Sequence, residues 1–171
     1  MKTKTITLYE YSELSDKAKE KALSDWNQYN DDPLMQSHMI NLLKEELDER
    51  GIKYKEDSID VRYSLSYCQG DGFMFEGELE WKQYTIYIKH HGHYYHSYSK
   101  FVEMQETENL GFHIENEKDE QEFEELYQDI CKKMERVGYE HIEWYTSEEV
   151  FIEACEANGY TFRENGEMEN A

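Results

Sequence analysis

The sequence predicts an α+β fold in which an antiparallel β-meander of about four to six strands packs against about four helices. Polar and apolar residues alternate through most of residues 59–100, as they do in strands that bury one face. Apolar residues recur at helical spacing in four other segments, each bounded by capping or terminating residues. With 15 Tyr, 7 Phe and 3 Trp among its 171 residues, the chain is long and apolar enough for one domain with a core.

The N-terminal part predicts one short strand and two helices. Residues 4–9 are rich in β-branched side chains, which favours a strand. Ser15 is a suitable N-cap for a helix over residues 16–29. Asp and Pro at 32–33 predict the start of a second helix, and Gly51 predicts its end. The expected apolar face of this second helix comprises Leu34, Met35, Met39, Leu42, Leu43 and Leu47.

The meander is predicted as four consecutive strands over residues 59–67, 73–81, 84–90 and 93–101. The first two give the clearest two-residue periodicity in the sequence. In the second strand, the residues expected to face the core are Phe73, Phe75, Leu79 and Trp81. The residues expected to face solvent are Met74, Glu76, Glu78 and Glu80.

The C-terminal part predicts an acidic helix over residues 117–136, ended by Gly138. A last helix is expected to begin at Thr146–Glu149 and to end at Gly159, followed by a short strand over residues 160–163. We therefore expect a single α+β domain over residues 1–164. A flexible acidic tail is expected over residues 165–171.

The net charge of −21 is the strongest indication of what the protein binds. Residues 101–171 hold 21 acidic and 5 basic residues, a net charge of −16. Such a charge repels nucleic acids and anionic membranes and attracts positive protein surfaces, including the nucleic-acid grooves of other proteins. The plainer alternative is a set of solvated helix faces. The candidate partner-binding residues are Glu117, Asp119, Glu120, Glu122, Glu124 and Glu125.

The cysteines and the hydropathy predict a cytoplasmic protein. Three Cys, an odd number, favour a reducing compartment and no disulfide. The sequence has no signal-peptide pattern and no apolar run near the ~18 residues that cross a bilayer, so we expect no membrane association.

Two turns of the meander predict a zinc site. The glycine-rich turn at residues 69–72 and the turn at residues 91–92 are expected at the same end of the sheet. A tight turn at 91–92 would place His90 opposite His93, with Cβ atoms ~5 Å apart. Imidazole combined with thiolate or carboxylate suits Zn²⁺. The candidate ligands are Cys68, Asp71, His90 and His93.

Two further interpretations of this segment stay open at this point, one without a metal and one in which the metal site is the centre of the protein's function. The glycines of the two turns can serve tight backbone geometry alone, with the histidines exposed. Residues Cys68–His96 can also form the centre of a small zinc-binding module or metal-dependent enzyme. However, no nucleophile elbow, P-loop, Rossmann or paired-carboxylate pattern is present, and the sequence therefore favours a protein that is not an enzyme.

Two segments resemble a family of small acidic proteins carried by bacteriophages and mobile elements. The first is Leu14–Ala22 (LSDKAKEKA) with Trp26, and the second is Ser66–Gly72 (SYCQGDG) with Phe75 and Gly77. A stretch rich in His, Gly and Tyr over residues 90–96 also fits, so the resemblance covers roughly residues 10–100.

This resemblance implies an inhibitor of a host defence system that acts in the cytoplasm of a bacterial host cell. The class includes anti-CRISPR proteins that bind Cas effectors, and a Cas9-like effector ribonucleoprotein is the most specific expected partner. The acidic region after residue 100 could then occupy a channel lined by Lys and Arg that otherwise holds guide RNA or target DNA. No direct binding of nucleic acid is expected.

Overall fold

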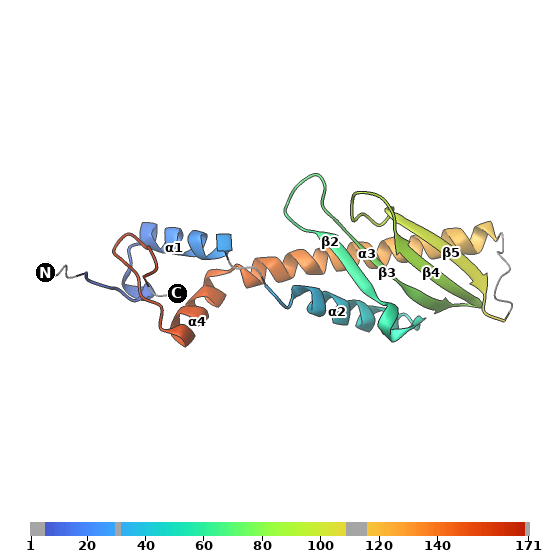
Figure 1. Cartoon of the computed structure of the whole chain (residues 1–171), viewed down its shortest axis with the longest axis horizontal. Helices are drawn as coiled ribbons and strands as arrows, with labels where there is room; N and C mark the ends of the chain where they lie inside the picture. Colours follow the sequence, from blue (N-terminus) through green and yellow to red (C-terminus); the bar gives the residue numbers. More distant parts are fainter. Residues whose placement is uncertain (1–5, 30–31, 109–115, 170–171) are drawn as a thin grey trace, which may run out of the picture. The chain divides into compact units, whose positions relative to one another are not determined.

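The computed structural model describes residues 6–29, 32–108 and 116–169. Over these residues the chain has the predicted α+β fold, with four α-helices and an antiparallel sheet of five strands (Figure 1). The sequence-based prediction of the fold class is confirmed.

The chain divides into two compact units. One comprises residues 33–140 and holds the sheet, and the other comprises residues 1–32 and 141–171. The single domain expected over residues 1–164 stays a prediction, since it concerns whether both units unfold together.

The sheet is built around its longest strand, β3. Its strands are β1 (Lys53–Tyr54), β2 (Asp60–Ser64), β3 (Gly72–Trp81), β4 (Tyr84–His90) and β5 (Lys100–Glu106). Strands β1 and β2 both pair with one edge of β3, and β4 and then β5 follow on its other side. Of the core side chains predicted in β3, Phe73, Phe75 and Leu79 are buried and Trp81 is partly exposed, while Met74, which was expected to face solvent, is buried. Strand β3 therefore buries side chains from both of its faces at this end.

Two predicted strand boundaries are wrong because the loops are longer than predicted. The first strand ends at Ser64, and Tyr67 has a φ of 57°, which removes it from any strand. The last strand begins at Lys100 and not at His93, because residues 91–99 form a loop.

Helices α2 (Met35–Glu49) and α3 (Glu117–Tyr145) belong to the same unit as the sheet for most of their length. Helix α2 starts at Met35, two residues after the predicted Pro33, and Leu34 is 68% exposed instead of facing the core. Helix α3 continues through Gly138, where it was predicted to end. A Cβ atom at this glycine would lie 2.5 Å from Leu65 Cδ1, so the glycine serves close packing.

A buried carboxylate with partly exposed cationic partners joins α2 to α3. Glu46 is buried and accepts hydrogen bonds from Arg50 and Lys133, and Arg50 also contacts Asp129 with its Nη2 2.7 Å from the Oδ2. Burial of Glu46 opposes its ionisation, but the two cationic partners outweigh it and lower the pKa of the carboxyl. Glu46 thus stays ionised beside two cations, and its charge is not left uncompensated in the core.

The other unit is a small aromatic cluster between α1 (Asp16–Tyr29) and α4 (Glu148–Asn158). The Tyr11 and Phe151 rings meet edge to face with centroids 5.0 Å apart. As predicted, the Ser147 hydroxyl caps α4 and Gly159 ends it in the left-handed conformation.

In place of the two short terminal strands predicted at residues 4–9 and 160–163, the described residues form isolated β-bridges. Phe162 pairs with Tyr9 and with Met168, while residues 4 and 5 lie outside the described residues. The segment from residue 165, predicted as a flexible tail, folds back as far as Glu169, whose N–H donates to the Thr161 carbonyl oxygen. Residues 170 and 171 lie outside the described part.

Substituting Gly166 tests this folded-back segment. Gly166 has a φ of 84°, and a Cβ atom there would lie 2.1 Å from the Ala18 carbonyl oxygen. We expect Gly166→Ala to lower the free energy of unfolding by about 2–4 kcal/mol, through backbone strain and steric overlap. Urea unfolding followed by the fluorescence of Trp26, in the same cluster, measures it.

Gly159→Ala is the matched control. Its φ of 65° is also left-handed, but no atom lies within 4 Å of the added Cβ. It should therefore cost only about 1–2 kcal/mol. Equal losses in the two variants would contradict the packing of residue 166 against α1.

Candidate functional site

Three of the six acidic residues predicted to bind a partner instead hold α3 to the protein's own sheet. Lys82 Nζ lies 2.8 Å from Asp119 Oδ1 and 2.7 Å from Glu122 Oε2. The Tyr84 hydroxyl also donates to Asp119, at 2.7 Å. Hydrogen bonds from Lys82 and then from Tyr84 lower the pKa of Asp119.

The third of these acids, Glu124, neutralises a buried lysine. The side chain of Lys100 is only 4% exposed, and its Nζ lies 2.8 Å from Glu124 Oε2. The same ammonium donates to the Ser97 carbonyl oxygen at 2.6 Å and lies 4.4 Å from the centroid of the Tyr127 ring. Lys100 thus ties the start of β5 to α3.

The other three acids are exposed on the first turns of α3. Glu125 accepts a hydrogen bond from Gln121 at 3.0 Å. Glu117 and Glu120 have no ion-pair partner among the residues that the structure describes. Only this subset of the predicted residues can offer free carboxylates to another molecule.

Glu117 and Glu120 line a groove of 480 Å³ between β5 and α3. The lining residues are Val102, Met104, Glu117, Glu120, Gln121, Phe123 and Glu124. Met104 and Phe123 are buried and form an apolar floor. An apolar floor with a carboxylate rim suits a side chain that has an aliphatic stem and a cationic head, such as Lys or Arg.

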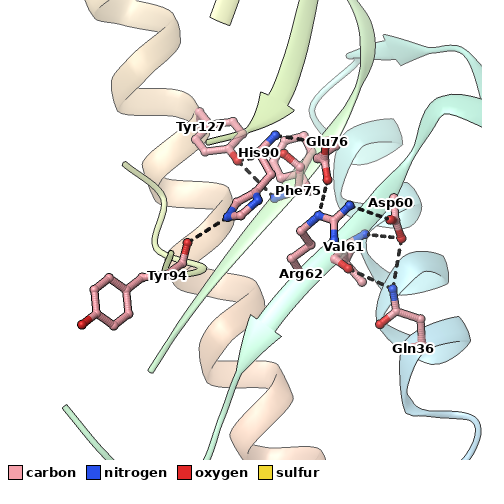
Figure 2. Close-up of polar contacts among 9 residues, drawn as sticks. All are labelled: Gln36, Asp60, Val61, Arg62, Phe75, Glu76, His90, Tyr94 and Tyr127. Atoms are coloured by element: carbon pink, nitrogen blue, oxygen red, sulfur yellow. Dashed lines mark hydrogen bonds and ion pairs between the residues drawn. The ribbon is translucent and has the colours of Figure 1, made fainter. Parts of the chain in front are cut away.

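The ladder between β3 and β4 has a gap that a tyrosine of α3 fills. Strand β4 pairs with β3 only from Gly77 onward, and at Phe75 the tyrosine hydroxyl of Tyr127 takes the place of a strand. This hydroxyl accepts from the Phe75 N–H at 3.1 Å and donates to its carbonyl oxygen at 2.8 Å (Figure 2). Burial raises the pKa of Tyr127 well above its usual range, so the hydroxyl stays protonated and can donate.

The neighbouring Glu76 lies at the same gap in the ladder, with its side chain on the opposite face of β3 from that of Phe75. Its carboxylate accepts from the His90 N–H at 3.0 Å and from Arg62, which also contacts Asp60 (Figure 2). Gln36 of α2 reaches this network by donating to Asp60 and to the Val61 carbonyl oxygen. The polar network therefore runs from α2 through β2 and β3 to the end of β4.

The two turns singled out in the sequence do lie at the same end of the sheet, as predicted. A Cβ atom at Gly70 would lie 3.6 Å from the Tyr94 ring, and one at Gly72 would lie 2.6 Å from His96 Nδ1. The loop at residues 91–99 therefore packs directly on the glycines of the other turn, and these glycines serve close approach.

The carboxylate of Asp71 organises the first of these turns. It accepts hydrogen bonds from the backbone N–H groups of Ser66 at 2.7 Å and Cys68 at 3.0 Å, and from the hydroxyls of Ser64 at 3.0 Å and Tyr139 at 2.6 Å. The hydrogen bond from Tyr139 is the largest cause of a pKa of Asp71 far below its usual range. Asp71 thus has a structural role that joins the turn to α3.

The pairing of His90 with His93 is wrong. His90 lies opposite Lys100 in the ladder, because the hairpin loop is longer than the tight turn assumed. His90 Nε2 lies 3.1 Å from the Tyr94 carbonyl oxygen, while His93 is exposed. Of the four predicted zinc ligands, the structure brings together Cys68 and Asp71, with the Sγ 3.2 Å from the Oδ1.

No group of three or more potential metal-binding side chains occurs in the described part of the chain. The residues present at this end of the sheet therefore do not form the predicted four-ligand set. Zinc binding stays an untested prediction.

The sequence-based prediction missed the residues that complete the acidic groove. The alternation of Val102 and Met104 with Phe101 and Glu103 is readable in the sequence, but it gives no sign of which helix covers that face. Lys100 carries no sequence signal of burial, since lysine is almost always exposed.

No family assignment accompanies these sites. Comparison of the chain with family models, curated proteins and solved structures gave no match. Within the described residues, no helix is sufficiently long and apolar to cross a bilayer.

The ion pair of the buried lysine can be tested by removing its carboxylate. Glu124→Gln leaves Lys100 buried without a counter-charge, and we expect a loss of about 1–2 kcal/mol in the free energy of unfolding, limited by the partial exposure of Glu124. Glu125→Gln, one residue away and exposed, should change stability by less than about 0.5 kcal/mol. Equal effects in a urea titration would contradict this role.

The role of Asp71 predicts a pH effect with a defined sign. Because its pKa is lowered in the folded state, the ionised carboxylate stabilises the fold above the ordinary aspartate pKa of about 3.9, and this contribution is lost as the pH falls further. In Tyr139→Phe the Asp71 pKa should rise. Carboxyl ¹³C NMR titration measures this, and an unchanged titration midpoint would exclude Tyr139 as the main cause.

Proposed function

We propose that this protein is a phage-type inhibitor that acts by binding, not by catalysis, and that its partner is a basic host protein that handles nucleic acid. The observation that carries the proposal is the groove beside β5, which combines free carboxylates with an apolar floor. The net charge of −21 supports the same conclusion, since it favours positive partners and disfavours nucleic acid itself.

The groove and the overall charge would contribute differently to such binding. The overall charge steers the encounter and raises the association rate, with a strong dependence on salt. The buried floor formed by Met104 and Phe123 would add affinity by removing apolar surface from water. Glu117 and Glu120 would then select a partner side chain that carries a positive charge.

A Cas9-type effector ribonucleoprotein is the most specific form of this proposal. It rests on the resemblance of residues 14–22 and 66–77 to phage proteins. Such an effector holds its nucleic acid in a positively charged channel, which an acidic protein can enter or cover. Inhibition would follow from competition for that channel.

Affinity for a Cas9 ribonucleoprotein, measured by biolayer interferometry, tests the proposal. We expect binding that weakens strongly between low and moderate salt, and no binding to free DNA. The double variant Glu117→Gln/Glu120→Gln should weaken binding about tenfold or more, equivalent to about 1.4 kcal/mol.

The matched control is Glu149→Gln/Glu153→Gln on α4, which removes the same charge from exposed positions. It should change affinity much less than the groove variant. If no binding occurs at low salt, the Cas9 form of the proposal fails. If both double variants lose affinity equally, the groove is not the binding site.

A further inference from the structure

The free edge of β5 runs alongside the acidic groove. In the order of the sheet, β5 is the last strand, and no other strand among residues 6–29, 32–108 and 116–169 pairs with its outer side. Edge strands present unpaired backbone N–H and C=O groups, which template the addition of another strand.

The hydrogen bonds that flank the β4–β5 ladder identify which backbone groups point outward. The Thr107 N–H donates to the Gln83 carbonyl oxygen, and the His91 N–H donates to that of Ser99. In antiparallel pairs, hydrogen-bonded and non-hydrogen-bonded positions alternate. Within the register of β4 and β5, residues 101, 103 and 105 of β5 therefore bond to β4.

The backbone groups of Val102 and Met104 consequently point away from β4, toward the free edge. These same two residues line the groove with their side chains, because they lie opposite the buried Ile88 and Ile86. Backbone donors and acceptors, an apolar floor and the carboxylates of Glu117 and Glu120 thus meet along one edge.

We propose that β5 binds an extended segment of the partner by strand addition, with basic side chains of that segment in the acidic groove. This inference rests on the proposed function and specifies how the partner is bound. The added strand would hydrogen-bond to Val102 and Met104. Strand addition gives affinity through the main chain, and specificity through alternate side chains.

The geometry defines a sequence pattern for the bound segment. Successive side chains of a strand point to opposite faces, so two residues separated by one would face the groove. These should be Lys or Arg, with stems on Val102 and Met104 and charges at Glu117 and Glu120. The intervening residue would lie opposite Glu103, with Phe101, which is 60% exposed, as its diagonal neighbour on the same face, and an apolar or aromatic side chain there would reach the Phe101 ring.

The negative charge of the chain favours a basic segment over a second copy of the chain as the strand added to β5. Pairing of β5 with β5 of another copy would bring together two chains of net charge −21 each and would place Glu103 opposite its own counterpart. Like charges directly opposite each other on paired strands are destabilising.

Amide hydrogen exchange of the full ¹⁵N-labelled chain tests the proposal, with a capped peptide of alternating Lys and Val, about nine residues long, as the probe. Saturating peptide should slow exchange at the amides of Val102 and Met104 about tenfold or more. Amides of residues 101, 103 and 105, already bonded to β4, should change little. A peptide of the same sequence with every backbone amide N-methylated keeps its charge but has no N–H to donate to the edge, and it should give no protection.

Two variants of the full chain sharpen the result. Val102→Pro removes one outward N–H but no bond to β4, and should reduce binding of the Lys–Val peptide at least about tenfold. Glu117→Gln/Glu120→Gln should reduce the affinity for this peptide without altering protection of the amides bonded to β4.

The outcomes separate this inference from the proposed function. Salt-sensitive binding of the peptide without protection of Val102 and Met104, or equal binding of the N-methylated peptide, would overturn strand addition and leave the acidic binding function standing. A failure of the Lys–Val peptide to bind also overturns strand addition. A failure of both peptides and of the Cas9 ribonucleoprotein to bind at low salt would overturn both proposals.

Discussion

Lys82, in the turn between β3 and β4, and Lys100, at the start of β5, meet the carboxylates on the first turns of α3, and the remaining structure of this unit depends on that contact. The sheet can bury one face only if a helix covers it, and the helix that does so is the most acidic segment of the chain. The lysines offset its repulsive charge where it touches the sheet. They also determine which carboxylates stay without an ion-pair partner among the described residues.

The positions of the acidic residues therefore indicate a binding site better than the size of the net charge does. A net charge of −21 would make any surface of this protein attractive to a basic partner. Glu117 and Glu120 differ from the other exposed acids because they adjoin an apolar floor and an unpaired strand edge, at Val102 and Met104. Long-range steering by the whole chain and short-range recognition at one edge are compatible, since they act at different separations.

Much of the fold could be predicted from the sequence because its signals are local. Alternation in β3 and β4, and the caps at Ser147 and Gly159, depend on neighbouring residues only. Long-range packing could not be predicted in this way. Gly138 carries the signature of a helix stop, yet α3 continues through it, and the missing Cβ leaves room for the Leu65 side chain. The site was partly predictable for the same reason: the acidic helix was identified, but not the lysines and the strand edge that divide its carboxylates into structural and exposed sets.

The most direct test of the central claim is a map of backbone chemical-shift changes in the full ¹⁵N-labelled chain on addition of a short oligolysine at low salt. If location matters beyond charge, the largest changes should cluster at residues 102–104 and 117–120, with smaller changes on α4. Changes spread evenly over the acidic residues of both units would contradict the account, because they would show that the groove adds nothing to the general negative charge.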